Sequence, residues 1–104
     1  FIEISDKRFY DAGYWGMDKL LQKNEYPTAI YAAYSHIAVG ILRRIQESKY
    51  SIPQHFSLIC MDDIASVPYY PIKLSNIKMH LDDLAFITVE LLFKRIKEKQ
   101  CIGL

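Results

Sequence analysis

The chain has 104 residues, 51% of them hydrophobic, and a formal net charge of +1 at pH 7. This length suits one domain or part of one, and the apolar content is enough for a packed core, which excludes a disordered chain. With 13 basic and 12 acidic residues, the charge excludes a strongly basic nucleic-acid surface, and no apolar run reaches the roughly 18 residues of a membrane span.

The two cysteines, Cys60 and Cys101, have no metal-ligand spacing. A bare pair in a chain with a real core is typical of reduced thiols in the cytoplasm. The sequence starts without methionine inside a predicted strand, Phe1–Ile4, so we expect it to be part of a longer protein.

The first half of the chain alternates between strand and helix patterns. Apolar residues recur at helical spacing from about Tyr10 to Lys23, and a short run of strand formers follows at Thr28–Ala33. Ser35 is a suitable N-cap for a second helix, in which Ile37, Ile41 and Ile45 share one face. This stripe indicates a helix that lies on a sheet.

The second half continues the alternation. A buried strand is predicted at Phe56–Met61, a short or edge strand at Leu74–Met79, and a last helix that Asp82 or Asp83 can cap. The order predicts an α/β fold with a mainly parallel, doubly wound sheet and helices on both faces, in three αβα layers. Ligands of such sheets bind beyond the carboxyl ends of the strands.

Four segments together resemble the lactose-repressor (LacI/GalR) family of transcription regulators. They are Pro27–Ala33, Ile37–Gly40, Ile52–Pro53 and Ser57–Ile64, at the spacings of that family's signature. The resemblance extends from about residue 6 to residue 96. Where the family usually has a glycine after the second helix this chain has Lys49, which predicts a strained left-handed residue there.

The resemblance implies one half of a periplasmic-binding-protein-like (type I) fold, in which two lobes close on a small effector. Residues 1–80 would form most of the second lobe, and residues 81–104 would cross the hinge and pack on the first lobe. DNA would be bound only by a helix-turn-helix head outside this chain. The implied protein is a cytoplasmic homodimer without a cofactor, whose effector is a sugar or a sugar phosphate.

Five residues match effector-contacting positions of the family. Asp62 would accept hydrogen bonds from the effector, although an aspartate there can also cap the following loop. Tyr34 replaces the usual asparagine and would stack on a sugar, plug the pocket or pack on the surface. Arg8 stands where an aromatic is common, and a one-residue shift would put Phe9 there instead. If Arg8 itself faces the cleft it would favour an anionic effector, unless it is simply solvated. Ser35 replaces an aspartate, and Leu81 matches an apolar cleft position.

The resemblance also implies a dimer interface. It would be formed by the helix after Ser35, through Val39, Leu42 and Arg43, and by the loop that contains Tyr70. An exposed tyrosine between two prolines suits the centre of an interface, although the same ring could fold back on its own sheet.

The sequence gives less support to two other classes of function, an enzyme and an extracytoplasmic binding protein. The three histidines (His36, His55 and His80) have no nucleophile or paired carboxylate at fixed spacing, so an enzyme is not expected. The best enzymatic rival is phosphoryl transfer with magnesium at Asp62. The nearer rival is an extracytoplasmic sugar-binding protein of the same fold.

Overall fold

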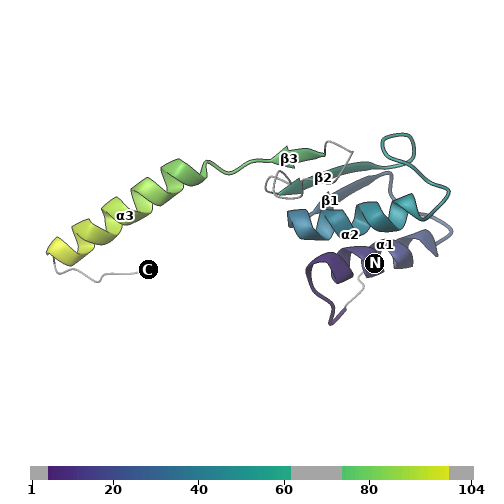
Figure 1. The fold of residues 1–104 in the computed structure, drawn as a ribbon, viewed down its shortest axis with the longest axis horizontal. Coiled ribbons are helices and arrows are strands. Elements are labelled where there is room, and N and C mark those ends of the chain that lie inside the picture. Colours follow the sequence, from purple (N-terminus) through teal and green to yellow (C-terminus); the bar gives the residue numbers. More distant parts are fainter. Residues whose placement is uncertain (1–4, 62–73, 99–104) are drawn as a thin grey trace.

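The computed structural model describes residues 5–61 and 74–98. Helices and strands alternate along the chain from its first helix to its last (Figure 1). The elements are α1 (Phe9–Leu21), β1 (Ala29–Ala32), α2 (Ser35–Gln46), β2 (Ser57–Met61), β3 (Ser75–Ile77) and α3 (Leu81–Glu98). They confirm the predicted helices and strands to within a few residues, while the predicted strand Phe1–Ile4 lies outside the described residues.

The three strands form one parallel sheet in the order β1-β2-β3. Ala32 pairs with Cys60 near the end of β1, and Met61 pairs with Ile77 at the end of β2. Since parallel neighbours need a crossover, α2 connects β1 to β2 and returns the chain to the start of the sheet. The mainly parallel α/β architecture is therefore confirmed.

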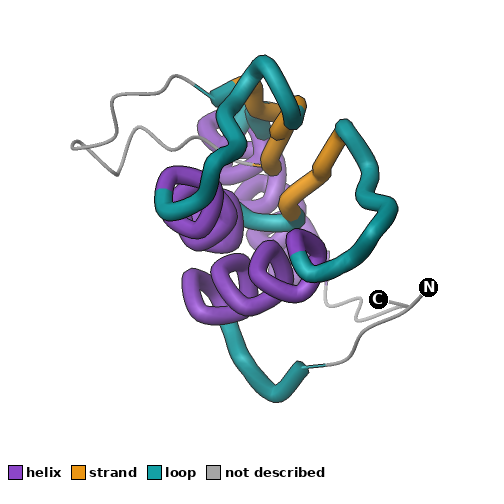
Figure 2. Tube along the Cα trace, turned by 90° about the vertical axis from the view of Figure 1, so that its right-hand side faces the viewer, coloured by secondary structure: helices purple, strands orange, loops and turns teal. Residues whose placement is uncertain are grey.

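Helices α1 and α2 lie on the same side of the sheet, as two perpendicular views show (Figures 1 and 2). On the opposite face the alternating strand side chains of Tyr31 and Ile59 remain 55% and 37% exposed. Within the described residues, helices therefore cover one face of the sheet and not the two faces that the sequence predicts.

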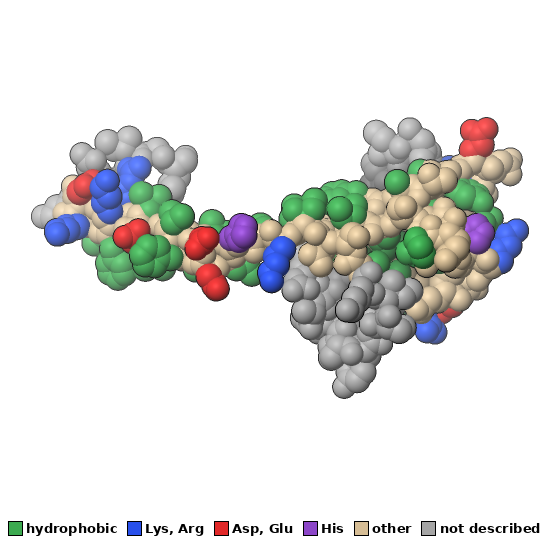
Figure 3. Space-filling model, turned by 90° about the horizontal axis from the view of Figure 1, so that it is seen from above, with side chains coloured by type: hydrophobic (Ala, Val, Ile, Leu, Met, Phe, Trp, Pro, Cys, Tyr) green, Lys and Arg blue, Asp and Glu red, His purple; other side chains and the backbone are tan. Residues whose placement is uncertain are grey.

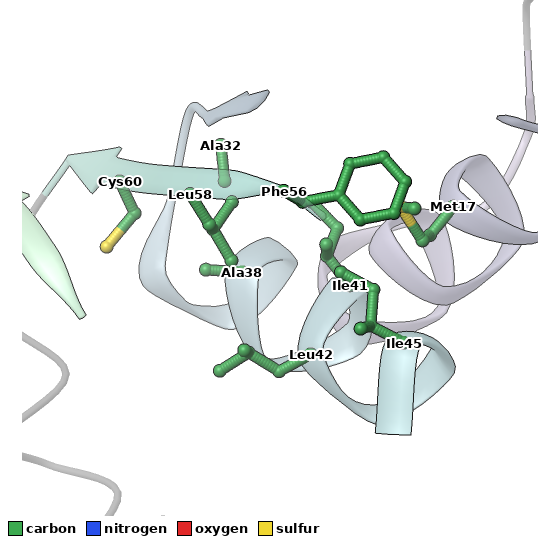
Figure 4. Close-up of a cluster of buried hydrophobic side chains, with 9 residues drawn as sticks. All are labelled: Met17, Ala32, Ala38, Ile41, Leu42, Ile45, Phe56, Leu58 and Cys60. Atoms are coloured by element: carbon green, nitrogen blue, oxygen red, sulfur yellow. The ribbon is translucent and has the colours of Figure 1, made fainter. Parts of the chain in front are cut away.

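A compact apolar core fills the space between the sheet and the two helices (Figure 4). Phe56, just before β2, and Cys60 at its end are fully buried. Every second residue of β2 is buried against α2. The face of α2 that meets the sheet carries the apolar stripe predicted from its sequence. The core comprises Met17, Ala32, Ala38, Ile41, Leu42, Ile45, Phe56, Leu58 and Cys60.

The first helix packs closely against the second. A Cβ atom at Gly13 would lie 2.0 Å from the backbone oxygen of Ile37, so only glycine permits this approach. Near the far ends of the same helices, Arg44 Nε donates to Asp18 Oδ1 at 2.8 Å. The two helices therefore run side by side in the same direction.

The predicted N-caps of α2 and α3 are wrong by one to three residues. The N-cap of α2 is Tyr34, whose extended backbone carbonyl accepts from the Ala38 amide at 3.1 Å, and Ser35 is the first helical residue. Asp82 and Asp83 lie in the first turn of α3, not before it. Both carboxylates still face the positive end of the helix dipole, which explains their place in the sequence.

The expected strain at Lys49 is absent. Among the described non-glycine residues only Phe9, at the start of α1, has a positive φ, of 52°. Just after the end of α2, the Ser48 amide donates a hydrogen bond to the Ile45 carbonyl at 2.9 Å. A lysine is therefore accommodated without the left-handed turn that a glycine would serve.

The last helix, α3, extends away from the rest of the structure (Figures 1 and 3). None of its described residues is buried, and Phe86 and Phe93 are each 66% exposed. Figure 3 shows apolar side chains along this arm, with acidic groups in its first turn and basic groups in its last. None of the helices within residues 5–61 and 74–98 combines the length and the uniform apolarity that crossing a bilayer demands.

Candidate functional site

The carboxyl ends of β1 and β2 lie at one edge of the sheet. Their pairing is parallel, and Ala32 at the end of β1 is opposite Cys60 in β2. The chain leaves β1 at this edge and enters α2 two residues later, at Ser35. This is the place at which open α/β sheets bind ligands, because loops and helix N-termini gather there.

Tyr34 and Ser35 stand at this edge in different environments. The Tyr34 side chain is 55% exposed, and the residue forms the N-cap of α2 without a side-chain capping bond. Ser35 is only 7% exposed and is the first residue of the helix. Tyr34 is therefore available to a ligand, whereas Ser35 has little surface to offer.

The start of α1 lies beside the start of α2. Arg8 is the exposed N-cap of α1, with an extended backbone, and Phe9 follows it with its side chain 58% exposed. The Phe9 ring meets the ring of His36 edge to face, with centroids 6.0 Å apart and an interplanar angle of 68°. The two helix N-termini thus meet, and an exposed ring stands on each.

The backbone of Phe9 is in a left-handed conformation, with a φ of 52°, which is unfavourable in free energy. A left-handed conformation in a residue with a Cβ atom costs about 1–2 kcal/mol. Such residues gather at functional sites, where other contacts hold them in place. The sequence identified Arg8 and offered Phe9, one position later, as an alternative aromatic, whereas His36 was given no role of its own in the site; the signal that marks His36 is its position in the first turn of α2 beside the start of α1.

The other predicted effector residues are not brought to this edge by the described structure. Leu81 is the first residue of α3 and is 60% exposed, on the arm that follows β3. Asp62 lies outside the described residues. A ligand wall can therefore be described only from Arg8, Tyr34 and Ser35 among the predicted residues.

The residues predicted for a dimer interface have mixed positions. Leu42 is 1% exposed and belongs to the core, so it has no surface for a second chain. Val39 is partly buried, and the Arg43 side chain is 55% exposed while its Nε donates to Glu47 at 2.8 Å. Tyr70 lies outside the described residues.

A surface hollow of about 620 Å³ lies along α1 and α2, away from the sheet edge. Its lining is aromatic and charged: Lys7, Tyr10, Asp11, Tyr14, Trp15, Asp18, Arg43 and Glu47. The Tyr14 hydroxyl donates to Glu47 Oε2 at 2.5 Å. This bond lowers the pKa of the Glu47 carboxyl and raises the pKa of the Tyr14 hydroxyl.

Metal-binding side chains do not cluster in the described part of the chain. No group of three or more histidine, cysteine, aspartate or glutamate side chains there could hold an ion. The described side chains at the sheet edge are aromatic rings, hydroxyls, an imidazole and a guanidinium, which suit recognition of a small polar molecule.

The fold and this edge define one α/β lobe of the periplasmic-binding type. The family described as periplasmic binding protein-like domain matches residues 3–101, and this chain belongs to it. Its relatives place it with the LacI/GalR transcription regulators, as the sequence motifs predicted.

One such relative is the ribose operon repressor of Haemophilus influenzae, 35% identical over 88 residues. That match covers 85% of this chain and 26% of the repressor, so the chain spans about a quarter of its relative.

Two solved structures are also similar. A LacI family transcriptional regulator from Enterococcus faecium with bound ribose has a TM-score of 0.74 and 28% identity, over 89% of this chain and 34% of the regulator. A regulator of the same family from Enterococcus faecalis, also with bound ribose, has a TM-score of 0.77 and 27% identity, over 92% and 35% of the two chains. The extracytoplasmic alternative is not favoured by these relatives.

Proposed function

We propose that this chain is part of the second lobe of the effector-sensing domain of a LacI-family transcription regulator, and that it binds a small sugar without catalysing a reaction. The observation that carries the proposal is the meeting of the carboxyl ends of β1 and β2 with the N-termini of α1 and α2 at one edge. Ligands bind at this edge in open parallel sheets.

The effector we propose is a pentose such as ribose, because two similar regulators were solved with ribose bound. Tyr34 would contact the sugar with its exposed ring, and Arg8 would donate hydrogen bonds to a hydroxyl or phosphate group at the rim of the site. Asp62, next after β2 in the sequence, would accept hydrogen bonds from hydroxyls. Ser35, with 7% of its surface exposed, would support Tyr34 from the start of α2, and Leu81 would reach the ligand only in the closed arrangement of the two lobes.

The effector would act by closing the lobes. Residues 81–104 would pack on the first lobe. The wide exposed apolar surface of α3 supports this role, since burial of such a surface against another part of the protein is favourable. A ligand that binds the closed arrangement more tightly shifts the population toward it. The closed state would then change the spacing of DNA-binding heads that lie outside this chain.

The regulator would be a cytoplasmic homodimer. Val39 and Arg43 on α2, together with Tyr70, would form its interface, whereas Leu42 would support α2 from within the core. The near-neutral charge of the chain fits a sensing module whose partner is a sugar and not DNA.

The proposal is tested with a hybrid repressor, in which the 88 matching residues of this chain replace their counterparts in the Haemophilus influenzae ribose operon repressor. Calorimetry should show binding of D-ribose, and Tyr34→Ala should weaken it about tenfold, as loss of a contacting ring does. Tyr31→Ala is the matched control, because Tyr31 is equally exposed, at 55%, but lies on the uncovered sheet face. A hybrid that folds and does not bind D-ribose would overturn the proposal.

A further inference from the structure

His36 lies in the first turn of α2, two residues after the exposed Tyr34. Its ring is exposed and packs edge to face against Phe9 of α1, with centroids 6.0 Å apart. This contact limits the rotation of the imidazole, because the Phe9 ring occupies one side of it. His36 is thus held at the edge where the two helix N-termini meet.

The polar atoms of His36 are not used elsewhere in the described part of the chain. No hydrogen bond or ion pair to its ring nitrogens is present there. His55 differs, since its Nδ1 accepts from the Ser51 amide at 3.1 Å and also meets the Ser51 hydroxyl at 3.2 Å. An oriented ring with both nitrogens available is a donor and an acceptor for a ligand.

The Phe9 ring supports the same interpretation. It is 58% exposed although His36 packs against it, so part of its surface remains open beside the imidazole. A sugar offers an apolar face of C–H groups and a rim of hydroxyls, and sites for such ligands combine a ring with a few placed polar groups. Phe9 and His36 provide both parts at one place.

We propose that His36 is a specificity-determining residue of the effector site: one imidazole nitrogen bonds to a sugar hydroxyl while the sugar packs against the Phe9 ring. This inference rests on the proposed function, because it assigns a further residue to the same site. The discrimination comes from the hydroxyl, since a site built to hydrogen-bond a hydroxyl rejects sugars that lack it or present it differently.

The first test is an NMR titration of the isotope-labelled hybrid repressor described above, which contains both lobes, with millimolar D-ribose. The imidazole signals of His36 and the ring signals of Phe9 should shift in a saturable way, while those of His55 stay in place. Shifts at Tyr34 without shifts at His36 or Phe9 would overturn the inference and leave the proposed function standing. Absence of shifts at all three residues would overturn both.

Variants separate a contact from a structural role. His36→Ala should raise the dissociation constant for D-ribose about five- to tenfold, the range expected for loss of one good polar contact. His36→Gln retains a donor and an acceptor and should restore part of that loss. His55→Ala removes an imidazole from the loop before β2 and should leave the titration unchanged.

The decisive readout is selectivity. The chain with His36 should prefer D-ribose over at least one of 2-deoxy-D-ribose and D-arabinose, and His36→Ala should bring that ratio of dissociation constants close to one. A ratio that His36→Ala leaves unchanged would show that the imidazole does not choose the sugar, even if overall affinity falls.

Discussion

A Cβ atom at Gly40 would lie 2.1 Å from the backbone oxygen of Tyr10, because α1 and α2 meet main chain to main chain at this point. No side chain is compatible with that distance unless a helix moves. The contact lies one residue after Phe9 on α1 and one turn after His36 on α2, so it sets the separation of the two helix starts that carry the candidate site.

Gly40→Ala should therefore destabilise the protein. Overpacking costs about 1–3 kcal/mol and here must displace backbone, which outweighs the gain of about 1 kcal/mol in helix propensity. We expect a net loss of about 2 kcal/mol in the free energy of unfolding, measured by urea denaturation.

Gly16→Ala is the matched control on α1, since nothing lies within 4 Å of a Cβ atom there. It should gain up to about 1 kcal/mol from helix propensity. Equal midpoints for the two alanine variants would contradict the close contact of α1 with α2.

The bond between Tyr14 and Glu47 predicts how stability depends on pH. The Tyr14 hydroxyl holds the pKa of Glu47 below its ordinary value of 4.5, so the bond stabilises the folded state above that pH and its contribution is lost as the pH falls through the folded pKa. The pKa of Tyr14 is raised above 10.0, so the contribution persists until the pH rises beyond that value.

Tyr14→Phe should accordingly lower the urea midpoint at pH 7, and the difference from the unmodified chain should shrink as the pH falls below 4.5 and Glu47 becomes protonated. In the same variant the NMR-detected pKa of the Glu47 carboxyl should rise toward its ordinary value. Tyr10→Phe serves as the control because Tyr10 stacks on Tyr14 through its ring and has no such bond to Glu47. A loss of stability in Tyr14→Phe that does not change with pH would show that the Tyr14 hydroxyl does not bond to an ionised Glu47 carboxylate.

Much of the fold follows from periodicity in the sequence. The spacing of Ile37, Ile41 and Ile45 predicts the face of α2 that meets the sheet, and the run Phe56–Met61 predicts the central strand; both are confirmed because burial imposes these periods directly. Caps depend on local backbone angles, which composition indicates only weakly. The capping role predicted for Ser35 was therefore one residue late.

The candidate site was predicted only in part, because it depends on which helix starts meet in space. Tyr34 could be identified from its place after a strand, and the parallel pairing of β1 and β2 puts the ends of those strands together. The contact of Phe9 with His36 joins residues 27 positions apart and follows from the packing of α1 on α2. No spacing within the sequence reports such a contact.

Phe56 is the residue whose truncation should cost most. It is fully buried, and it packs against the rings of Tyr26 and Tyr50 at centroid distances of 5.4 and 5.7 Å. Phe56→Ala removes a large side chain from a closed site, which costs about 3–5 kcal/mol. The loss should be visible as a collapse of the thermal transition and of near-ultraviolet circular dichroism.

Phe56→Leu keeps most of the volume and should retain a cooperative transition at a lower temperature. Tyr31→Ala, which truncates a half-exposed ring on the open sheet face, should change stability far less. A Phe56→Ala variant as stable as Tyr31→Ala would contradict the position of Phe56 in the core.

The exposed apolar surface of α3 predicts association of the isolated chain. Phe86 and Phe93 lie seven residues apart on one side of the helix, each 66% exposed, and burial of one such ring contributes about 2 kcal/mol. Light scattering should therefore detect dimers or larger species, and Phe86→Glu combined with Phe93→Glu should shift the population to monomer. Lys94→Glu changes the charge of the same helix without removing apolar area, so the associated fraction should persist. Circular dichroism verifies that α3 stays helical in both variants, and an unmodified chain that is monomeric at high concentration would show that this surface does not drive association.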